Sequence, residues 1–208
     1  MNFVNQKAYN ISAFNCDQEY YEKRQVILEL IRAMNREQVI FALTCSAALF
    51  FNGITDDFND FDIVVKESDS LKFIEVFTKI LGGTLTIGQN GKESFFDSKF
   101  YSNGKIGNVE FDIISVFTVT TFGTRYQYVL DEQEIQFIDG IPVCPIEACC
   151  ILYGMMTGWQ QKRQMKYSAT LEFLKKTGVK HPEIIQTNQE IPEFIQEDIK
   201  KLLELKSE

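Results

Sequence analysis

Two segments of this 208-residue chain place aspartates within runs of β-branched and aromatic residues, and they constrain the fold more than any other feature. Residues 60–65 read DFDIVV and residues 109–114 read VEFDII, which predicts two strands. Because side chains alternate across a strand, Asp60 and Asp62 project from one face while the apolar residues beside them face a core. If the two strands are neighbours, Asp112 joins this pair, and three carboxylates converge at one place.

The rest of the chain predicts an alternation of helices and strands. Strands are predicted at residues 38–43, 60–65, 84–87, 93–101 and 108–117, with turns at Asn52–Gly53, Asn90–Gly91 and Asn103–Gly104. Helices are predicted at residues 18–35, with Asp17 as the cap, and at residues 47–51, 68–82, 145–157, 166–176 and 192–205. After a turn at residues 139–142 the pattern is helical. We therefore predict an α/β (α+β) fold, with a mixed sheet and packed helices over residues 1–140 and a small helical annex over residues 141–208.

Composition limits the partners and the environment of this chain. Lys and Arg number 21 against 29 Asp and Glu, and the net charge of −8 disfavours a long nucleic acid as a partner. The longest mostly apolar stretch, residues 39–51, is shorter than the ~20 residues that cross a bilayer, so no membrane span is expected. The first ten residues lack the pattern of a secretion signal, and the five cysteines lack CxxC spacing. We expect a cytoplasmic protein with free, mostly buried thiols.

Three converging carboxylates predict a site for a divalent cation. Like charges at one place raise one another's pKa unless a cation lies between them, and hard oxygen ligands suit Mg²⁺ or Mn²⁺. Two such ions stabilise the entering and departing oxygens of a phosphoryl displacement. A lone D-x-D segment is more often a solvated strand end, so a second signal is needed. Cys45–Ser46 supplies it, because a turn from strand to helix directs backbone N–H groups and the helix dipole at one point, where phosphate binds.

In combination these motifs resemble the nucleotidyltransferase fold typified by DNA polymerase beta, and within it the small bacterial nucleotidyltransferases of the antibiotic-modifying and toxin types. Cys45–Ser46 matches the glycine-containing turn that opens a helix in this family. Asp60–Phe61–Asp62 matches its pair of acids, and Asp112 matches its third acid on a later strand. The resemblance covers about residues 38 to 116, and the annex is similar to the tail of the toxin-type members.

The resemblance implies a reaction and a role for each motif. A hydroxyl group of a small molecule, a protein or an RNA end would attack the α-phosphorus of a nucleoside triphosphate, and pyrophosphate would leave. Asp60 and Asp62 would ligate two Mg²⁺ ions, while Asp112 would ligate the catalytic ion and orient or deprotonate the attacking hydroxyl. The candidates for nucleotide binding are Cys45, Ser46, Lys162, Arg163 and Lys166.

Two departures from the family pattern leave other functions open. Cys45 stands where the family has glycine, and if that position needs a positive φ, a side chain costs about 1–2 kcal/mol and crowds the phosphates. The annex also lacks the acid that relatives carry after their basic residue. These departures favour, as an alternative, a catalytically degenerate protein of the same fold that acts as a binding or regulatory module. A third hypothesis is a hydrolase whose acids activate water.

Overall fold

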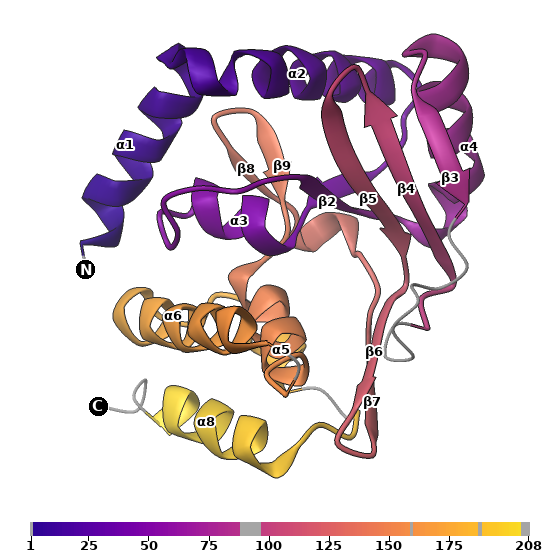
Figure 1. Ribbon diagram of the computed structural model, residues 1–208. Coiled ribbons are helices and arrows are strands. Elements are labelled where there is room, and N and C mark those ends of the chain that lie inside the picture. Colours follow the sequence, from indigo (N-terminus) through magenta and orange to yellow (C-terminus); the bar gives the residue numbers. More distant parts are fainter. Residues whose placement is uncertain (1, 88–96, 159, 187–188, 205–208) are drawn as a thin grey trace.

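A computed structural model describes residues 2–87, 97–158, 160–186 and 189–204 of the chain (Figure 1). The strands are β1 (Phe41–Leu43), β2 (Phe61–Val65), β3 (Thr84–Ile87), β4 (Phe100–Ile106), β5 (Val109–Ser115), β6 (Phe117–Thr121), β7 (Thr124–Tyr128), β8 (Gln136–Ile138) and β9 (Ile141–Val143). The main helices are α1 (Phe3–Cys16), α2 (Tyr21–Arg36), α3 (Cys45–Phe51), α4 (Ser70–Glu75), α5 (Ile146–Met155), α6 (Gln161–Thr177), α7 (Pro182–Ile185) and α8 (Glu193–Glu204). Short helical turns at Gln18–Tyr20, Glu67–Asp69, Val76–Ile80 and Glu132–Glu134 connect them.

Seven strands form one mixed sheet in the order β3-β4-β5-β2-β1-β9-β8, and β6 pairs with β7 in a separate hairpin. The pairs β2–β5 and β1–β9 are parallel, and the other pairs of the large sheet are antiparallel. In the view of Figure 1, α2 lies above this sheet and α5, α6 and α8 lie below it. The hairpin of β6 and β7 runs from the end of β5 down to α8, where Phe122 packs edge-on against Phe194 with ring centroids 5.8 Å apart.

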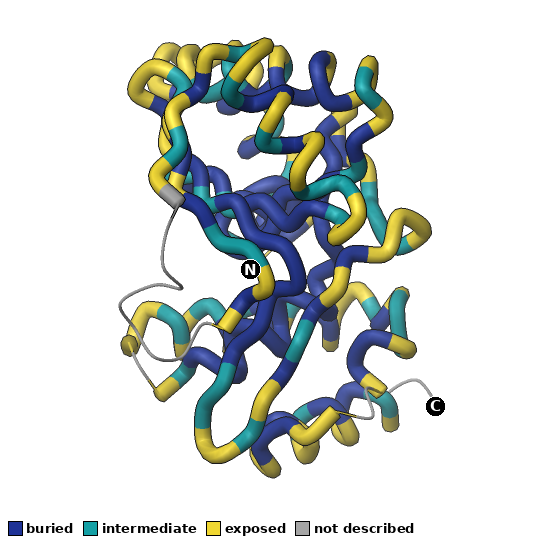
Figure 2. Tube along the Cα trace, turned by 90° about the vertical axis from the view of Figure 1, so that its right-hand side faces the viewer, coloured by how far each residue is buried: buried dark blue, intermediate teal, exposed yellow. Residues whose placement is uncertain are grey.

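The most deeply buried segments are the strand and helix around the predicted phosphate turn and the first helix of the annex. All seven residues of α3 and all ten residues of α5 are buried. In Figure 2 the buried chain forms a continuous layer through the middle of the molecule, and the outer helices are exposed on their outward faces. This layer explains why residues 39–51 and 146–155 are apolar without an amphipathic pattern, because a helix covered on every side needs no polar face.

Packing across the molecule also involves the segment that the sequence predicts as the annex. The strand β9 pairs with β1 through Leu43 and Val143, so the large sheet continues past residue 140.

The four buried cysteines and the exposed Cys16 are all free thiols, which confirms the prediction for the cysteines. Within the described part of the chain, every helix is too short or too polar to span a membrane.

Several predicted elements are confirmed within a few residues. These are the helices α2, α3, α5, α6 and α8, and the strands β1, β2, β3 and β5. The apolar residues of the D-x-D strand face the core as expected, because Phe61 and Ile63 are fully buried. Asp17, predicted as a helix cap, makes no capping bond through its side chain, and its backbone N–H instead ends α1 by donating to the Ala13 carbonyl at 2.8 Å.

One turn prediction is wrong. Asn103–Gly104 lies inside β4, and the chain turns at Gly107 and Asn108 instead. Gly104 serves a packing purpose here, because a Cβ at this position would lie only 2.9 Å from Cζ of Phe77. The glycine lets the helical segment behind the sheet approach β4 closely.

Other differences concern one predicted strand that begins later in the structure and two elements that were not predicted. The strand predicted at 93–101 begins only at Phe100, while its first residues and the predicted Asn90–Gly91 turn lie outside the described residues. The helix α1 carries no clear amphipathic signal, and the β6–β7 hairpin, whose apolar and polar residues alternate, is also absent from the prediction. In α1 the buried Asn10 replaces an apolar contact, since its side-chain amide donates to the carbonyls of Phe50 at 2.7 Å and Thr55 at 2.8 Å.

Candidate active site

A row of polar residues crosses the centre of the sheet at one register position. Asn103 on β4 is paired with Asp112 on β5, and Asp112 is paired with Asp62 on β2 through the parallel register of those strands. Beyond β2, the backbone N–H of Thr44 donates to the Asp62 carbonyl at 2.8 Å. The topology therefore brings Asp62 and Asp112 side by side from segments 50 residues apart. Asp60, just before β2, is half-buried like both of them.

The charges in this row act strongly on one another. Burial raises the pKa of Asp62 well above its ordinary value, and the neighbouring charges of Asp60 and Asp112 raise it further. Burial also raises the pKa of Asp112, and Asp60 again adds to the effect. Like charges directly opposite each other in a sheet are destabilising. A sheet that keeps such a pair at its centre therefore leaves a place where a positive charge is favourable.

The turn between β1 and α3 adjoins these carboxylates. Cys45 begins α3 with a φ of +48°, in the left-handed region where glycine is the favoured residue. Its side chain is buried, and this burial raises the pKa of the thiol well above its ordinary value. The negative charge of Asp62 is the second-largest cause of the increase. The next residue, Ser46, donates its backbone N–H to the Asp62 carboxylate, which opposes the rise in the pKa of Asp62. The turn and the acidic pair thus form one site.

One lysine of the predicted basic group reaches this site. Lys166 on α6 is half-buried, and its Nζ donates to the Tyr153 hydroxyl at 3.3 Å and lies 5.3 Å from the centre of that ring. Burial lowers the pKa of Lys166, whereas the charges of Asp62 and Asp60 act to raise it. Its ammonium group thus belongs to the electrostatic environment of the carboxylates.

The other two basic candidates lie on the same helix. Lys162 is exposed one turn before Lys166, and its charge acts to lower the pKa of that residue. Arg163 is half-buried on α6. Within the predicted basic group, Lys166 is thus a residue on whose charge Asp62 and Asp60 act.

Sequence reasoning missed two residues that contact Asp112. Asn103 donates its side-chain amide to Oδ1 of Asp112 at 2.5 Å and to the Tyr101 hydroxyl at 2.9 Å. The Tyr101 hydroxyl also forms a hydrogen bond with the Asp112 carboxylate. Burial, followed by the charge of Asp112, raises the pKa of Tyr101 to about 12, so this hydroxyl keeps its proton at neutral pH. The period-2 alternation of Tyr101 and Asn103 was the available signal, and the Asn-Gly turn motif obscured it.

The chemistry of these donors fits a divalent cation. Asp60, Asp62 and Asp112 supply hard carboxylate oxygens, and their mutual repulsion is what Mg²⁺ or Mn²⁺ offsets. Among the described residues, no group of three or more His, Cys, Asp and Glu side chains is already arranged around a common point for a metal ion. The three aspartates thus match a divalent cation in donor type and in charge. The sheet register fixes the relative position of two of them, Asp62 and Asp112.

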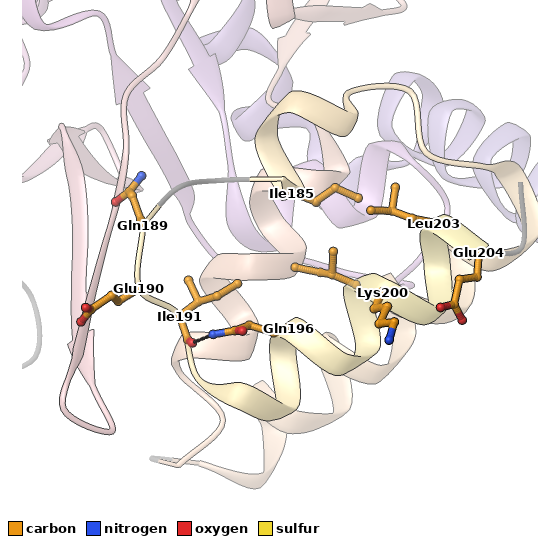
Figure 3. Close-up of a pocket in the computed structure, with 9 residues that line it drawn as sticks. Ile185, Gln189, Glu190, Ile191, Gln196, Lys200, Leu203 and Glu204 are labelled. Carbon is orange, nitrogen blue, oxygen red and sulfur yellow. Dashed lines mark hydrogen bonds between the residues drawn. The ribbon is translucent and has the colours of Figure 1, made fainter.

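A groove lies away from the carboxylates. The groove has a volume of about 610 Å³ and is lined by residues of α7, of α8 and of the segment 189–191 (Figure 3). Its lining includes the apolar residues Ile185, Ile191, Ile199 and Leu203. The side-chain amide of Gln196 donates to the Ile191 carbonyl at 2.7 Å. None of the predicted site residues lines this groove. The chemistry-bearing residues and this groove are therefore separate parts of the molecule.

Comparison with known proteins identifies the fold. No protein-family model matches the sequence, and no curated protein sequence matches it significantly. Among solved structures, the antibiotic-resistance factor ANT(2'')-Ia in solution matches with a TM-score of 0.51 and 14% identity, over 88% of this chain and 92% of that chain. ANT(2'')-Ia in complex with adenylyl-2''-tobramycin matches with a TM-score of 0.51 and 13% identity, over 86% of this chain and 97% of that chain.

A third solved structure agrees. TM1012 of Thermotoga maritima, a candidate nucleotidyltransferase, matches with a TM-score of 0.51 and 17% identity, over 74% of this chain and 94% of that chain. The chain therefore has the nucleotidyltransferase fold, an α/β fold with a mixed sheet, which confirms the predicted fold class. The matches to ANT(2'')-Ia cover most of the length of both chains.

Proposed function

We propose that this protein is a metal-dependent nucleotidyltransferase, which transfers a nucleoside monophosphate from a nucleoside triphosphate to a hydroxyl acceptor and releases pyrophosphate. One observation carries the proposal: the parallel register of β2 and β5 holds Asp62 opposite Asp112, with the charge of Asp60 acting on both. Two like charges opposite each other in the middle of a sheet destabilise the fold, and a bound cation would offset their repulsion. The shared fold with ANT(2'')-Ia supports the same reading.

Asp60, Asp62 and Asp112 would hold the magnesium ions. When bound, these ions supply charge stabilisation to the triphosphate and lower the pKa of the attacking hydroxyl. The carboxylate of Asp112 orients the acceptor hydroxyl and accepts its proton. The acceptor oxygen then forms a bond to the α-phosphorus, and the bond from that phosphorus to the pyrophosphate oxygen breaks.

Groups around the acids would bind the triphosphate. The ammonium group of Lys166 lies on the side of the site formed by α6 and can neutralise phosphate charge. Ser46 and the backbone N–H groups of the turn at Cys45 would contact the outer phosphates, and Lys162 and Arg163 extend the positive charge along α6. Tyr153, which is buried, fixes the position of the Lys166 side chain through its hydroxyl.

The acceptor class is proposed from the comparison and from charge. One of the structures that share the fold, ANT(2'')-Ia, is solved with adenylyl-2''-tobramycin. The net charge of −8 favours a cationic acceptor over a long polyanion. We therefore propose a small hydroxylated molecule as the first acceptor to test, with a protein or an RNA end as the other two classes.

The test uses α-labelled nucleoside triphosphates with Mg²⁺ and panels of the three acceptor classes. We expect pyrophosphate release together with labelled conjugate. The double variant Asp60→Ala, Asp62→Ala should lose at least 100-fold of the rate, whereas the matched double variant Asp56→Ala, Asp57→Ala, whose acids are exposed outside the site, should keep it. An unchanged rate in the first variant would show the assignment to be wrong. Labelled free monophosphate in place of conjugate would instead indicate the hydrolase.

A second candidate function rests on Cys45. A buried side chain stands at the left-handed position of the phosphate turn, where it crowds a ligand that glycine would admit. This favours a protein of the same fold that acts as a binding or regulatory module. Calorimetric titration with Mg²⁺ and the four nucleoside triphosphates separates the two functions, because metal-dependent nucleotide binding is expected of the enzyme and its absence is expected of the degenerate module.

A further inference from the structure

Asp112 is held from one side by a closed set of hydrogen bonds on β4. The amide group of Asn103 donates to Oδ1 of Asp112 at 2.5 Å and to the Tyr101 hydroxyl at 2.9 Å, and the Tyr101 hydroxyl bonds the Asp112 carboxylate in turn. Tyr101 and Asn103 are two residues apart on one strand, so both side chains lie on the face that carries Asp112. Two donors from a rigid strand leave the carboxylate plane little freedom to rotate.

The opposite side of Asp112 has a different neighbour. Asp62 is its register partner on β2, and the charges of Asp60 and Asp62 repel the Asp112 carboxylate. Asn103 is its register partner on β4 and is neutral, with two amide hydrogens to donate. The row therefore sets a hydrogen-bond donor on one side of Asp112 and a like charge on the other. Among the described residues, the Asp112 carboxylate is therefore anchored by hydrogen bonds from the β4 side alone.

From this arrangement we propose that Asn103, together with Tyr101, is a positioning residue, which fixes the Asp112 carboxylate in the orientation that cation binding and acceptor activation require. The inference rests on the proposed function. Groups that orient ligating carboxylates commonly change metal affinity or activity 10–100-fold when they are removed, although they touch neither metal nor substrate.

A purely structural role for Asn103 predicts a different outcome. The strands β4 and β5 are paired at seven register positions, from Phe100 with Ser115 to Ile106 with Val109. Backbone bonds along this ladder hold the two strands together whether or not one side-chain amide is present. If Asn103 served only to join the strands, its removal would lower the melting temperature and leave the site unchanged.

The experiment compares Asn103→Ala, Asn103→Asp and Tyr101→Phe with the full-length wild-type chain. The matched control is Asn108→Ala, because Asn108 lies at the turn of the same hairpin and its amide donates to Glu22, away from the site. Three quantities are measured: Mn²⁺ affinity by calorimetry without nucleotide, kcat and KM of transfer, and the melting temperature. The first readout does not depend on activity.

For Asn103→Ala we expect Mn²⁺ affinity to fall about 10-fold and kcat to fall about 10–100-fold, while KM for the nucleotide changes less than threefold. Asn103→Asp keeps the size of the side chain and replaces the donor with a charge that repels Asp112, so its kcat should fall at least as much, and it serves if the alanine variant does not fold. Tyr101→Phe should show a smaller loss, because the Asn103 donor remains. Asn108→Ala should match the wild type in all three quantities apart from a small change in melting temperature.

Two failures are distinguishable. If the wild type transfers nucleotide or binds Mn²⁺, and Asn103→Ala matches it in affinity while both Asn103 variants match it in kcat, the positioning role is overturned while the proposed function stands. If the wild type neither binds Mn²⁺ nor transfers nucleotide, the proposed function fails and the positioning role fails with it.

Discussion

Cys45 shows what a single residue contributes to the phosphate turn. Its φ of +48° costs any residue with a Cβ about 1–2 kcal/mol, and costs glycine nothing. We expect Cys45→Gly to be more stable than Cys45→Ala by about 1 kcal/mol, which reverses the usual order of these two residues in a helix. Urea unfolding of both variants measures the difference. A more stable alanine variant would show that this position is not held in the left-handed conformation.

Asp62 makes a second prediction at the residue scale. Its pKa is raised in the folded protein by burial and by the charges of Asp60 and Asp112, so the ionised group destabilises the fold. This penalty is absent below the unfolded aspartate pKa of about 3.9 and develops as the pH rises through the raised value. We expect Asp62→Asn to raise the free energy of unfolding by about 1–2 kcal/mol at pH 7.5 in a chelating buffer, and to bring no gain near pH 3.

Chemical unfolding at the two pH values measures this effect, with Asp56→Asn, an exposed acid outside the site, as the control. An equal gain at both pH values would contradict the electrostatic origin. Loss of transfer activity in the more stable Asp62→Asn variant is also expected, because functional sites are often built at the expense of stability.

The sequence predicts some members of the site and not others, for a physical reason. The alternation of side chains along a strand is enough to pair Asp60 with Asp62 and to identify Asp112 on a second strand. Whether those strands are neighbours depends on topology, which only the structure supplies. Asn103 followed by glycine satisfies the local rule for a turn, but the long pairing of β4 with β5 overrides that rule. The catalytic roles of these residues stay predictions.

At the scale of elements, the close approach of α5 to its neighbours depends on Gly154. A Cβ at this position would lie 2.8 Å from Cδ1 of Ile195 on α8 and 2.9 Å from Cε2 of Tyr167 on α6. We expect Gly154→Ala to destabilise the protein by about 1–2 kcal/mol, although alanine is the better helix former. Adding Ile195→Val, which removes the nearer methyl group, should recover part of this loss. Thermal unfolding checks both, and a stabilising Gly154→Ala would contradict the packing argument.

Elements with strong periodic or apolar signals are the ones that the sequence predicts well. The helix α2 has a regular apolar stripe, and α5 follows a proline and is mostly apolar, with Glu147 as its charged residue. The helix α1 is missed because its stripe is weak, with the polar Asn10 buried among Phe3, Ala13 and Phe14. A side chain whose hydrogen bonds are satisfied by distant carbonyls breaks the pattern without breaking the helix.

The whole molecule depends on contacts that cross residue 140. The division into residues 1–140 and 141–208 remains a proposal, yet β9 extends the large sheet beside β1, and α5 buries all of its residues. We expect a fragment of residues 1–140 not to fold cooperatively, because it loses this strand and exposes the apolar surface beneath α5. Circular dichroism during heating tests this, with a fragment of residues 1–178 as the comparison that keeps β9, α5 and α6. A sharp transition in the shorter fragment would contradict the expectation.

For the whole molecule, a few residues are enough to predict the fold class. The sequence does not predict that residues 141–208 contribute a strand to the large sheet. The order of the turn, the paired acids and the third acid is enough to indicate the nucleotidyltransferase fold, and the structural matches confirm it. The partner of the short strand β9 cannot be read from residues 141–143, since strand pairing across 100 residues is decided by the packing of the whole sheet.

If the facing aspartates of β2 and β5 bind a cation as proposed, the thermal stability of this protein will depend on the ions in the solution around it. By mass action, a small cation that associates only with the native chain adds stability that grows with its concentration. The free energy of unfolding would then depend on the concentration of that cation as well as on the amino-acid sequence. On that proposal, two samples of the same chain kept in buffers with and without a divalent cation should differ in melting temperature.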